Sequence, residues 1–157
     1  MDHTSEGVDV AMGIADDIRS YLSHEVGATV EGKGQNGEAR LVIAEQKSLL
    51  SKKKVEYLVK FTVDDEARVV RFFEMLKETS RGMSGGDAGA VGGGWGVSKE
   101  SYKTSTRGRE GDIEAQGSLL GKRFAFTFDY AKIRGAVQAI AERNGYRFDY
   151  RLTPTGL

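Results

Sequence analysis

The fold class rests on the stretch Val55-Glu56-Tyr57-Leu58-Val59-Lys60-Phe61-Thr62-Val63. Its odd-numbered side chains are all apolar, and three of its four even-numbered side chains are polar. Alternation with a period of two is typical of a strand in a sheet that buries one face. The stretch therefore predicts a strand over 55–63 and a sheet whose other face is open.

The residues after this strand predict a helix. Asp64 stands where a carboxylate can accept hydrogen bonds from the free N–H groups of a first helical turn. The apolar residues that follow fit one face of a helix. They are Val69, Val70, Phe72, Phe73 and Leu76. Gly82 lies beyond the expected end of this helix.

Two further helices are expected near the ends of the chain. Apolar residues at steps of three and four predict a helix over 8–22, which Gly27 ends. Asp129 is the expected cap of the other helix, and Asn144-Gly145 ends it because both residues tolerate the left-handed conformation. The apolar face of that helix comprises Ile133, Ala136, Val137 and Ile140.

Two heptapeptides suggest an internal duplication, Gln46-Lys47-Ser48-Leu49-Leu50-Ser51-Lys52 and Gln116-Gly117-Ser118-Leu119-Leu120-Gly121-Lys122. Each is followed by a Phe-Thr-x-Asp sequence, at 61–64 and at 126–129. Shared order and shared residues are the signature of a repeat. In that interpretation both heptapeptides connect equivalent strands, with the leucines at least half-buried and the lysines exposed.

These elements predict a single α+β domain over 1–157. An α-β-β-β unit occurs at about 8–64 and again at about 65–129, and a closing helix and strand occupy 130–152. Short connections favour antiparallel pairing. We therefore expect one curved antiparallel sheet of about seven strands, with three helices on one face. The expected strands span 28–31, 41–44, 55–63, 96–104, 112–118, 123–129 and 146–152.

Composition narrows the class of protein. The 23 basic residues equal the 23 acidic ones, so no net field attracts nucleic acid or a membrane. The absence of cysteine excludes disulfides, thiolate metal sites and cysteine nucleophiles, and it fits a reducing compartment. The sequence also lacks a signal peptide pattern and a run of about 18 apolar residues. We expect a soluble cytoplasmic protein without a membrane partner.

A GxGxxG motif at Gly32, Gly34 and Gly37 raises the question of dinucleotide binding. Such a motif requires a strand before it and a helix after it. Residues 38–43 instead read as a strand, and Asn36-Gly37 is a favoured pair for a tight hairpin turn. The motif therefore predicts a hairpin, and no cofactor is expected.

The glycine-rich segment 82–96 has no counterpart in the first copy of the repeat. Its composition is typical of a flexible linker, or of a flap in which Trp95 closes over a ligand or a partner. With Tyr102, Arg107 and Arg109, which follow it, Trp95 makes up the candidate site for ligand or partner binding.

Basic residues follow both heptapeptides. A pseudo-twofold arrangement would pair the two clusters as a phosphate-binding surface. The alternative is that the charges only protect the ends of sheet edges. The candidate nucleic-acid contacts are Lys52, Lys53, Lys54, Lys122 and Arg123.

No catalytic constellation emerges from the sequence. His3 and His24 lack the spacing of metal ligands, so no metal site is predicted. Ser48 and Ser118 have no adjacent histidine to activate them. The leading hypothesis is a non-enzymatic binding or assembly module, which grips a small ligand or protein partner between sheet, helices and flap, or forms a homodimer. Nucleic-acid binding is the alternative, and an enzyme whose site is not visible in sequence is the second alternative.

Overall fold

The computed structural model describes residues 13–82, 98–101, 113–114, 120–122 and 124–157. A first helix, α1 (Ile14–Ser20), continues into a single π-helical turn, η1 (Tyr21–Glu25). A longer helix, α3 (Tyr130–Arg143), precedes the last strand. The strands are β1 (Thr29–Glu31), β2 (Asn36–Lys47), β3 (Ser51–Asp64), β4 (Val69–Gly82), β5 (Ser98–Ser101) and β6 (Arg147–Arg151).

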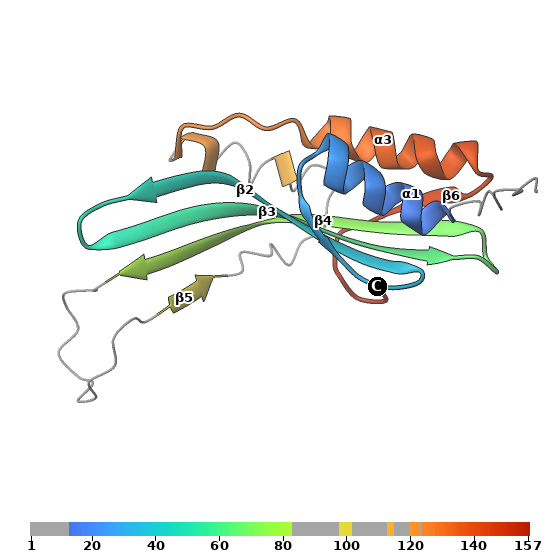
Figure 1. The fold of residues 1–157 in the computed structure, drawn as a ribbon, viewed down its shortest axis with the longest axis horizontal. Coiled ribbons are helices and arrows are strands. Elements are labelled where there is room, and N and C mark those ends of the chain that lie inside the picture. The colour runs from blue at the N-terminus through green and yellow to red at the C-terminus, as the bar shows by residue number, and fades with distance from the viewer. Residues whose placement is uncertain (1–12, 83–97, 102–112, 115–119, 123) are drawn as a thin grey trace, which may run out of the picture.

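The strands of the described residues form one open mixed sheet (Figure 1). Strands β1 to β5 pair antiparallel in chain order, whereas β6 pairs parallel with β4. β6 takes the first half of the free edge of β4, and β5 takes the second half. Helices α1 and α3 both cover one face of the sheet, and no helix of the described residues covers the other, which we call the open face.

β3 confirms the strand expected over 55–63 and extends it at both ends. The odd-numbered side chains from Val55 to Val63 are at most 3% exposed and pack under the helices. The even-numbered side chains belong to the open face, where Leu58 packs with Phe73 and Met75 of β4 in a small second apolar cluster. The terminal Leu157 covers that cluster.

The helix expected after Asp64 is wrong, because this segment is strand β4. β4 forms a hairpin with β3, and Asp64 caps the turn: its Oδ1 accepts from the N–H of Ala67 at 2.9 Å. Neighbouring apolar residues such as Phe72 and Phe73 lie on opposite faces of the sheet, in two different apolar clusters. A strand that is buried on both faces shows no simple alternation, so its pattern resembles that of a buried helix.

The last helix and strand are confirmed. The carboxylate of Asp129 accepts from the N–H of Lys132 at 3.0 Å, as an N-cap does. Gly145 ends α3 with a φ of +77°, which a glycine adopts without strain. After Gly145 the chain enters β6, which pairs parallel with β4 because α3 carries the chain back across the face of the sheet. The antiparallel pairing expected for this strand is therefore wrong.

The seven strands and the internal repeat are not supported. Residues 47–51 close the β2–β3 hairpin, whereas 120–122 form a helical turn, and 126–129 have no regular structure. Leu50 is 64% exposed and its counterpart Leu120 only 7%, so the two heptapeptides occupy unlike environments. The expected strand over 96–104 is met in part by β5. Most of 112–118 lies outside the described residues, although 113–114 are helical.

The glycine motif lies in the β1–β2 hairpin, as expected, but its turn falls at 32–35. Asn36 and Gly37 are the first residues of β2. A β-carbon on Gly37 would lie 2.2 Å from the Phe61 ring, so this glycine is required by close packing. Among the helices of the described residues, none is long and apolar enough to cross a membrane.

Candidate ligand site

One carboxylate lies inside the core. Glu74 belongs to the face of β4 that α3 covers, where Val70, Phe72 and Leu76 are its apolar neighbours on the same strand. It is 5% exposed. A buried ionisable group is stable only when it is paired and hydrogen-bonded, so its partners decide its role.

Four hydrogen bonds from three residues reach the Glu74 carboxylate. The Tyr57 hydroxyl of β3 donates to Oε2. The Tyr150 hydroxyl of β6 donates to Oε1 at 3.1 Å. Arg134 of α3 donates to the same oxygen twice, from Nε at 2.9 Å and from one terminal guanidinium nitrogen. The guanidinium lies 4.6 Å from the centre of the Tyr150 ring and also donates to Glu114 at 2.8 Å. We call these five residues the Glu74 network.

Burial dominates the electrostatics of this network. It raises the pKa of Glu74, and the hydrogen bonds from Tyr57, Arg134 and Tyr150 oppose that rise without cancelling it. Burial and the Glu74 charge raise the pKa of Tyr57 well above its ordinary value, so Tyr57 remains a donor. With its acceptor positions occupied, Glu74 serves as an anchor that ties α3 and β6 to β3 and β4.

A hollow of about 480 Å³ lies beside this network on the helix-covered side of the sheet. Three aromatic rings meet there: Tyr57 and Phe128 are 5.0 Å apart between centroids, and Phe128 and Tyr130 are 5.1 Å apart. We call this recess the aromatic hollow. Its lining residues are Glu114, Gly121, Lys122, Phe126, Thr127, Phe128 and Tyr130.

Among the described residues that line the hollow, Tyr130 alone has a buried polar group without a hydrogen bond. Tyr130 is only 6% exposed, and its hydroxyl has no hydrogen-bond partner. Burial and the charges of Glu74 and Glu114 raise its pKa to about 12, so the hydroxyl keeps its proton at neutral pH. The lining of the hollow thus combines apolar side chains, a tyrosine whose buried hydroxyl has no partner, and the basic residue Lys122.

A second recess of about 230 Å³ lies on the open face, at the end of the sheet near the β2–β3 hairpin. Five of its seven lining side chains are basic. Lys54 forms an ion pair with Glu56 at 2.5 Å, and Lys52 forms one with Glu45 at 2.8 Å. We call this recess the basic groove, and its lining is Arg40, Lys52, Lys54, Glu56, Lys77, Thr79 and Arg81.

The structure brings together only part of the site expected from sequence. Lys52 and Lys54 line the basic groove, and Lys53, between them on the strand, belongs to the other face of β3. Lys122 lines the aromatic hollow on the helix-covered side, so it is not joined to the lysines of β3. The remaining candidates, Trp95, Tyr102, Arg107, Arg109 and Arg123, lie outside the described residues.

Sequence reasoning missed Glu74, Arg134 and Tyr130. The available signal for Glu74 was its place within the apolar run from Val69 to Leu76, where a lone carboxylate requires a partner. Nothing in the sequence pointed to Arg134, which is 60 positions away and reaches Glu74 only through the packing of α3. Among the described residues, no group of three or more His, Cys, Asp and Glu side chains is placed to hold a metal ion.

Comparison with protein-family models, with curated proteins and with solved structures found no match to this chain.

Proposed function

We propose that this chain is a non-enzymatic binding module whose aromatic hollow holds a small amphipathic carboxylate. The observation that carries the proposal is the Tyr130 hydroxyl, a buried group without a hydrogen-bond partner on a residue that lines the hollow. Buried polar groups are nearly always hydrogen-bonded, and an unmet one costs about 1–3 kcal/mol. A ligand acceptor would recover that free energy.

The walls of the hollow define the ligand class. Phe126 and Phe128 favour an apolar body, and the volume of about 480 Å³ lies in the usual range for small-molecule sites. Lys122 supplies a cation that suits an anionic head group. Glu114 is paired with Arg134 at 2.8 Å, which offsets part of its negative charge.

The test uses decanoate as the probe, with decanol as its uncharged counterpart, in isothermal titration calorimetry. Tyr130→Phe removes the donor and keeps the ring, so we expect decanoate to bind about tenfold or more weakly, since a hydrogen bond to a charged group is worth about 1.5–3 kcal/mol. Tyr146→Phe is the matched control, because its hydroxyl donates to Asp65 in the β3–β4 turn instead.

A second measurement separates ligand binding from a purely structural role. Without ligand, Tyr130→Phe removes an unsatisfied group, so the free energy of unfolding should rise or stay the same. A loss of stability would show that the hydroxyl has a partner within the protein. Either that result or equal decanoate binding by wild type and Tyr130→Phe would overturn the proposal.

The other hypotheses from sequence stay predictions. Nucleic-acid binding now depends on the basic groove, where Lys52 and Lys54 lie with Arg40, Lys77 and Arg81. An enzymatic role gains no support from Glu74, whose oxygens are taken by protein donors. A cytoplasmic location remains part of the proposal, since the chain has no cysteine.

A further inference from the structure

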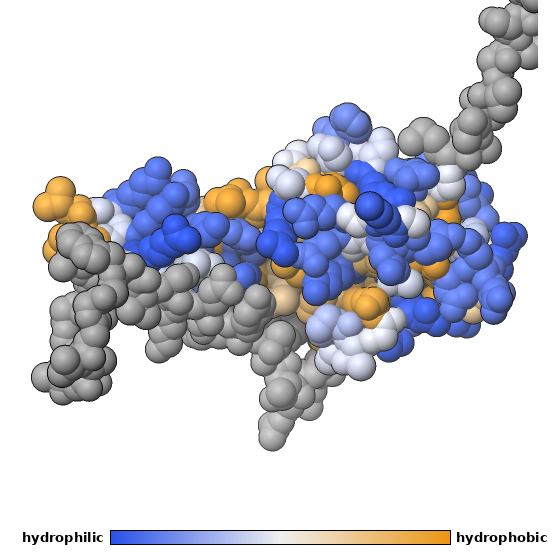
Figure 2. All heavy atoms as spheres, turned by 60° about the horizontal axis from the view of Figure 1, so that its bottom comes forward, coloured by the Kyte–Doolittle hydropathy of each residue, from blue (hydrophilic) through white to orange (hydrophobic). Residues whose placement is uncertain are grey.

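The tip of the β2–β3 hairpin exposes two leucines. Leu49 is 101% and Leu50 is 64% exposed, whereas Leu22, Leu58 and Leu76 are at most 6% exposed. In Figure 2, hydrophobic side chains stand at the end of the molecule where this hairpin lies, next to strongly hydrophilic ones. Single exposed apolar residues are common on proteins, but two adjacent leucines at a protruding tip call for an explanation.

The turn that carries these leucines is well closed. The N–H of Ser48 donates to the carbonyl oxygen of Ser51 at 2.8 Å. The N–H of Ser51 in turn donates to Oγ of Ser48 at 3.1 Å, and the two hydroxyl oxygens are 2.7 Å apart. The sequence and hydrogen bonds of the turn therefore hold Leu49 and Leu50 outward.

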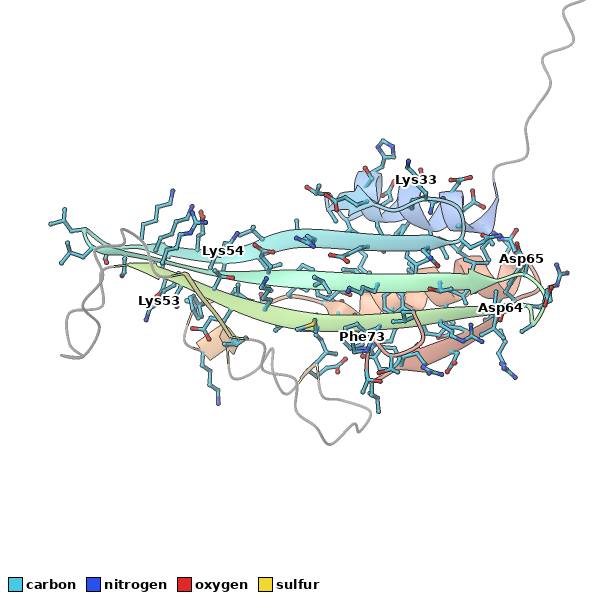
Figure 3. All side chains as sticks on the ribbon, turned by 90° about the horizontal axis from the view of Figure 1, so that it is seen from below. Lys33, Lys53, Lys54, Asp64, Asp65 and Phe73 are labelled. Carbon is cyan, nitrogen blue, oxygen red and sulfur yellow. The ribbon has the colours of Figure 1, made fainter. Side chains whose placement is uncertain are left out.

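Positive charge surrounds the tip. Residues 45–54 contain four lysines and one glutamate, a formal charge of 4 − 1 = +3 on a chain whose net charge is zero. Arg81 of β4 adds to it, because it pairs with Lys52 in the sheet. The basic groove begins here and extends along the open face, where Lys54 lies (Figure 3). The four lysines are Lys47, Lys52, Lys53 and Lys54.

Of three kinds of partner, two match part of this surface, and one matches all of it. Nucleic acid matches the cations but leaves the leucines unexplained. A second copy of the chain matches the leucines, but contact between two tips would bring their lysines together. An anionic bilayer matches both, because it accepts apolar side chains without a preformed pocket and attracts basic ones at its surface.

We propose that the β2–β3 hairpin tip docks on anionic phospholipid bilayers, with Leu49 and Leu50 inserted below the head groups and the surrounding lysines at the head-group level. Insertion of two side chains is shallow, and neither signal alone anchors a protein firmly. Binding should therefore require both leucines and lysines, and it should weaken as salt screens the charges.

The first experiment is cosedimentation with vesicles of phosphatidylcholine plus phosphatidylserine, against vesicles of phosphatidylcholine alone. Wild type should bind only the former. Leu49→Ser with Leu50→Ser should reduce binding about tenfold or more, and Lys52→Gln with Lys53→Gln should do the same. Val42→Ser and Lys132→Gln are the matched controls, since Val42 is 48% exposed on β2 away from the tip and Lys132 is exposed on α3.

The second experiment reports on insertion itself. The chain has no cysteine, so Leu49→Cys and, as its control, Val42→Cys each allow labelling at one site with a polarity-sensitive fluorophore. Emission from position 49 should shift to shorter wavelength on phosphatidylserine vesicles, and emission from position 42 should not.

Four outcomes would overturn the proposal. The first is that wild type does not bind phosphatidylserine vesicles, and the second is that the leucine variant binds them as wild type does. The third is that an RNA or DNA oligonucleotide binds at low salt with equal affinity to wild type and to the leucine variant, while vesicles fail to bind. The fourth is a wild-type dimer in size-exclusion chromatography that the leucine substitutions dissociate, because the occupant of the tip would then be a second copy.

Discussion

The two ends of β3 and β4 differ in what they do for the molecule. At the helix-covered end, every odd-numbered side chain of β3 from Val55 to Val63 is buried. From Ser51 to Lys54 none is buried, and β2 ends beside them in exposed residues. The same continuous strands thus form a core under the helices at one end and extend beyond α1 and α3 at the other, where their side chains are more exposed (Figure 1). Stability should depend on the first end, and recognition on the second.

The largest effect on stability is expected at Glu74. Glu74→Ala leaves Arg134, Tyr57 and Tyr150 without their common acceptor inside the core. The free energy of unfolding should fall by about 3–5 kcal/mol, because the buried Tyr57 hydroxyl loses its acceptor and the missing side chain leaves a cavity. Chemical denaturation measures it. Glu45→Ala, which removes an exposed carboxylate near the hairpin tip, should leave the midpoint unchanged; an equal loss there would abolish the distinction between the two ends.

The next largest effect concerns close packing at the helix-covered end. Gly37→Ala places a β-carbon 2.2 Å from the Phe61 ring, so the free energy of unfolding should fall by about 1–3 kcal/mol. Gly135→Ala in α3 is the control of opposite sign. A β-carbon there meets nothing within 4 Å, and replacing a helical glycine stabilises by about 0.5–1 kcal/mol. If both substitutions destabilise alike, the strand packing at Gly37 is looser than described.

A smaller effect follows from the raised pKa of Glu74. Above pH 4.5, the ordinary pKa of a glutamate, the folded chain retains a proton that the unfolded chain releases. The contribution of Glu74 is therefore complete below pH 4.5 and is lost as the pH rises through its folded-state pKa. The measurement is chemical denaturation of wild type and of Glu74→Gln at several pH values. The free energy of unfolding of wild type minus that of the variant should fall as the pH rises from 4.5 through the folded-state pKa of Glu74. A difference that rises with pH would mean that Arg134 outweighs burial.

Most of the helix-covered side could be predicted from sequence, because its signals are local. The alternation of 55–63, the Asp129 cap and the Asn144-Gly145 stop each depend on neighbouring residues. Strand β4 was missed because Phe72 and Phe73 are both buried, one on each face. Its β-branched and aromatic residues were the signal that favours a strand over a helix.

The repeat and the site show where local signals end. The heptapeptides at 46–52 and 116–122 share residues, yet the residues that the structure describes in the second form a helical turn rather than a hairpin. Leu120 is buried and Leu50 is exposed, because tertiary contacts decide burial and the heptapeptide does not. The Glu74–Arg134 pair spans 60 positions, so only the packing of α3 on β4 reveals it.

The smallest effect on stability should come from the hairpin tip. A side chain gains stability from burial, and Leu49 at 101% exposure has gained none, so Leu49→Ser with Leu50→Ser should change the free energy of unfolding by less than about 0.5 kcal/mol. Leu58→Ser is the matched substitution on β3, where the leucine is 6% exposed, and it should cost about 2–5 kcal/mol. Denaturation of the two variants in parallel tests this contrast. A tip variant as unstable as Leu58→Ser would show that the leucines belong to the core; an unperturbed one leaves an apolar pair that folding does not require, which is what a surface kept for docking predicts.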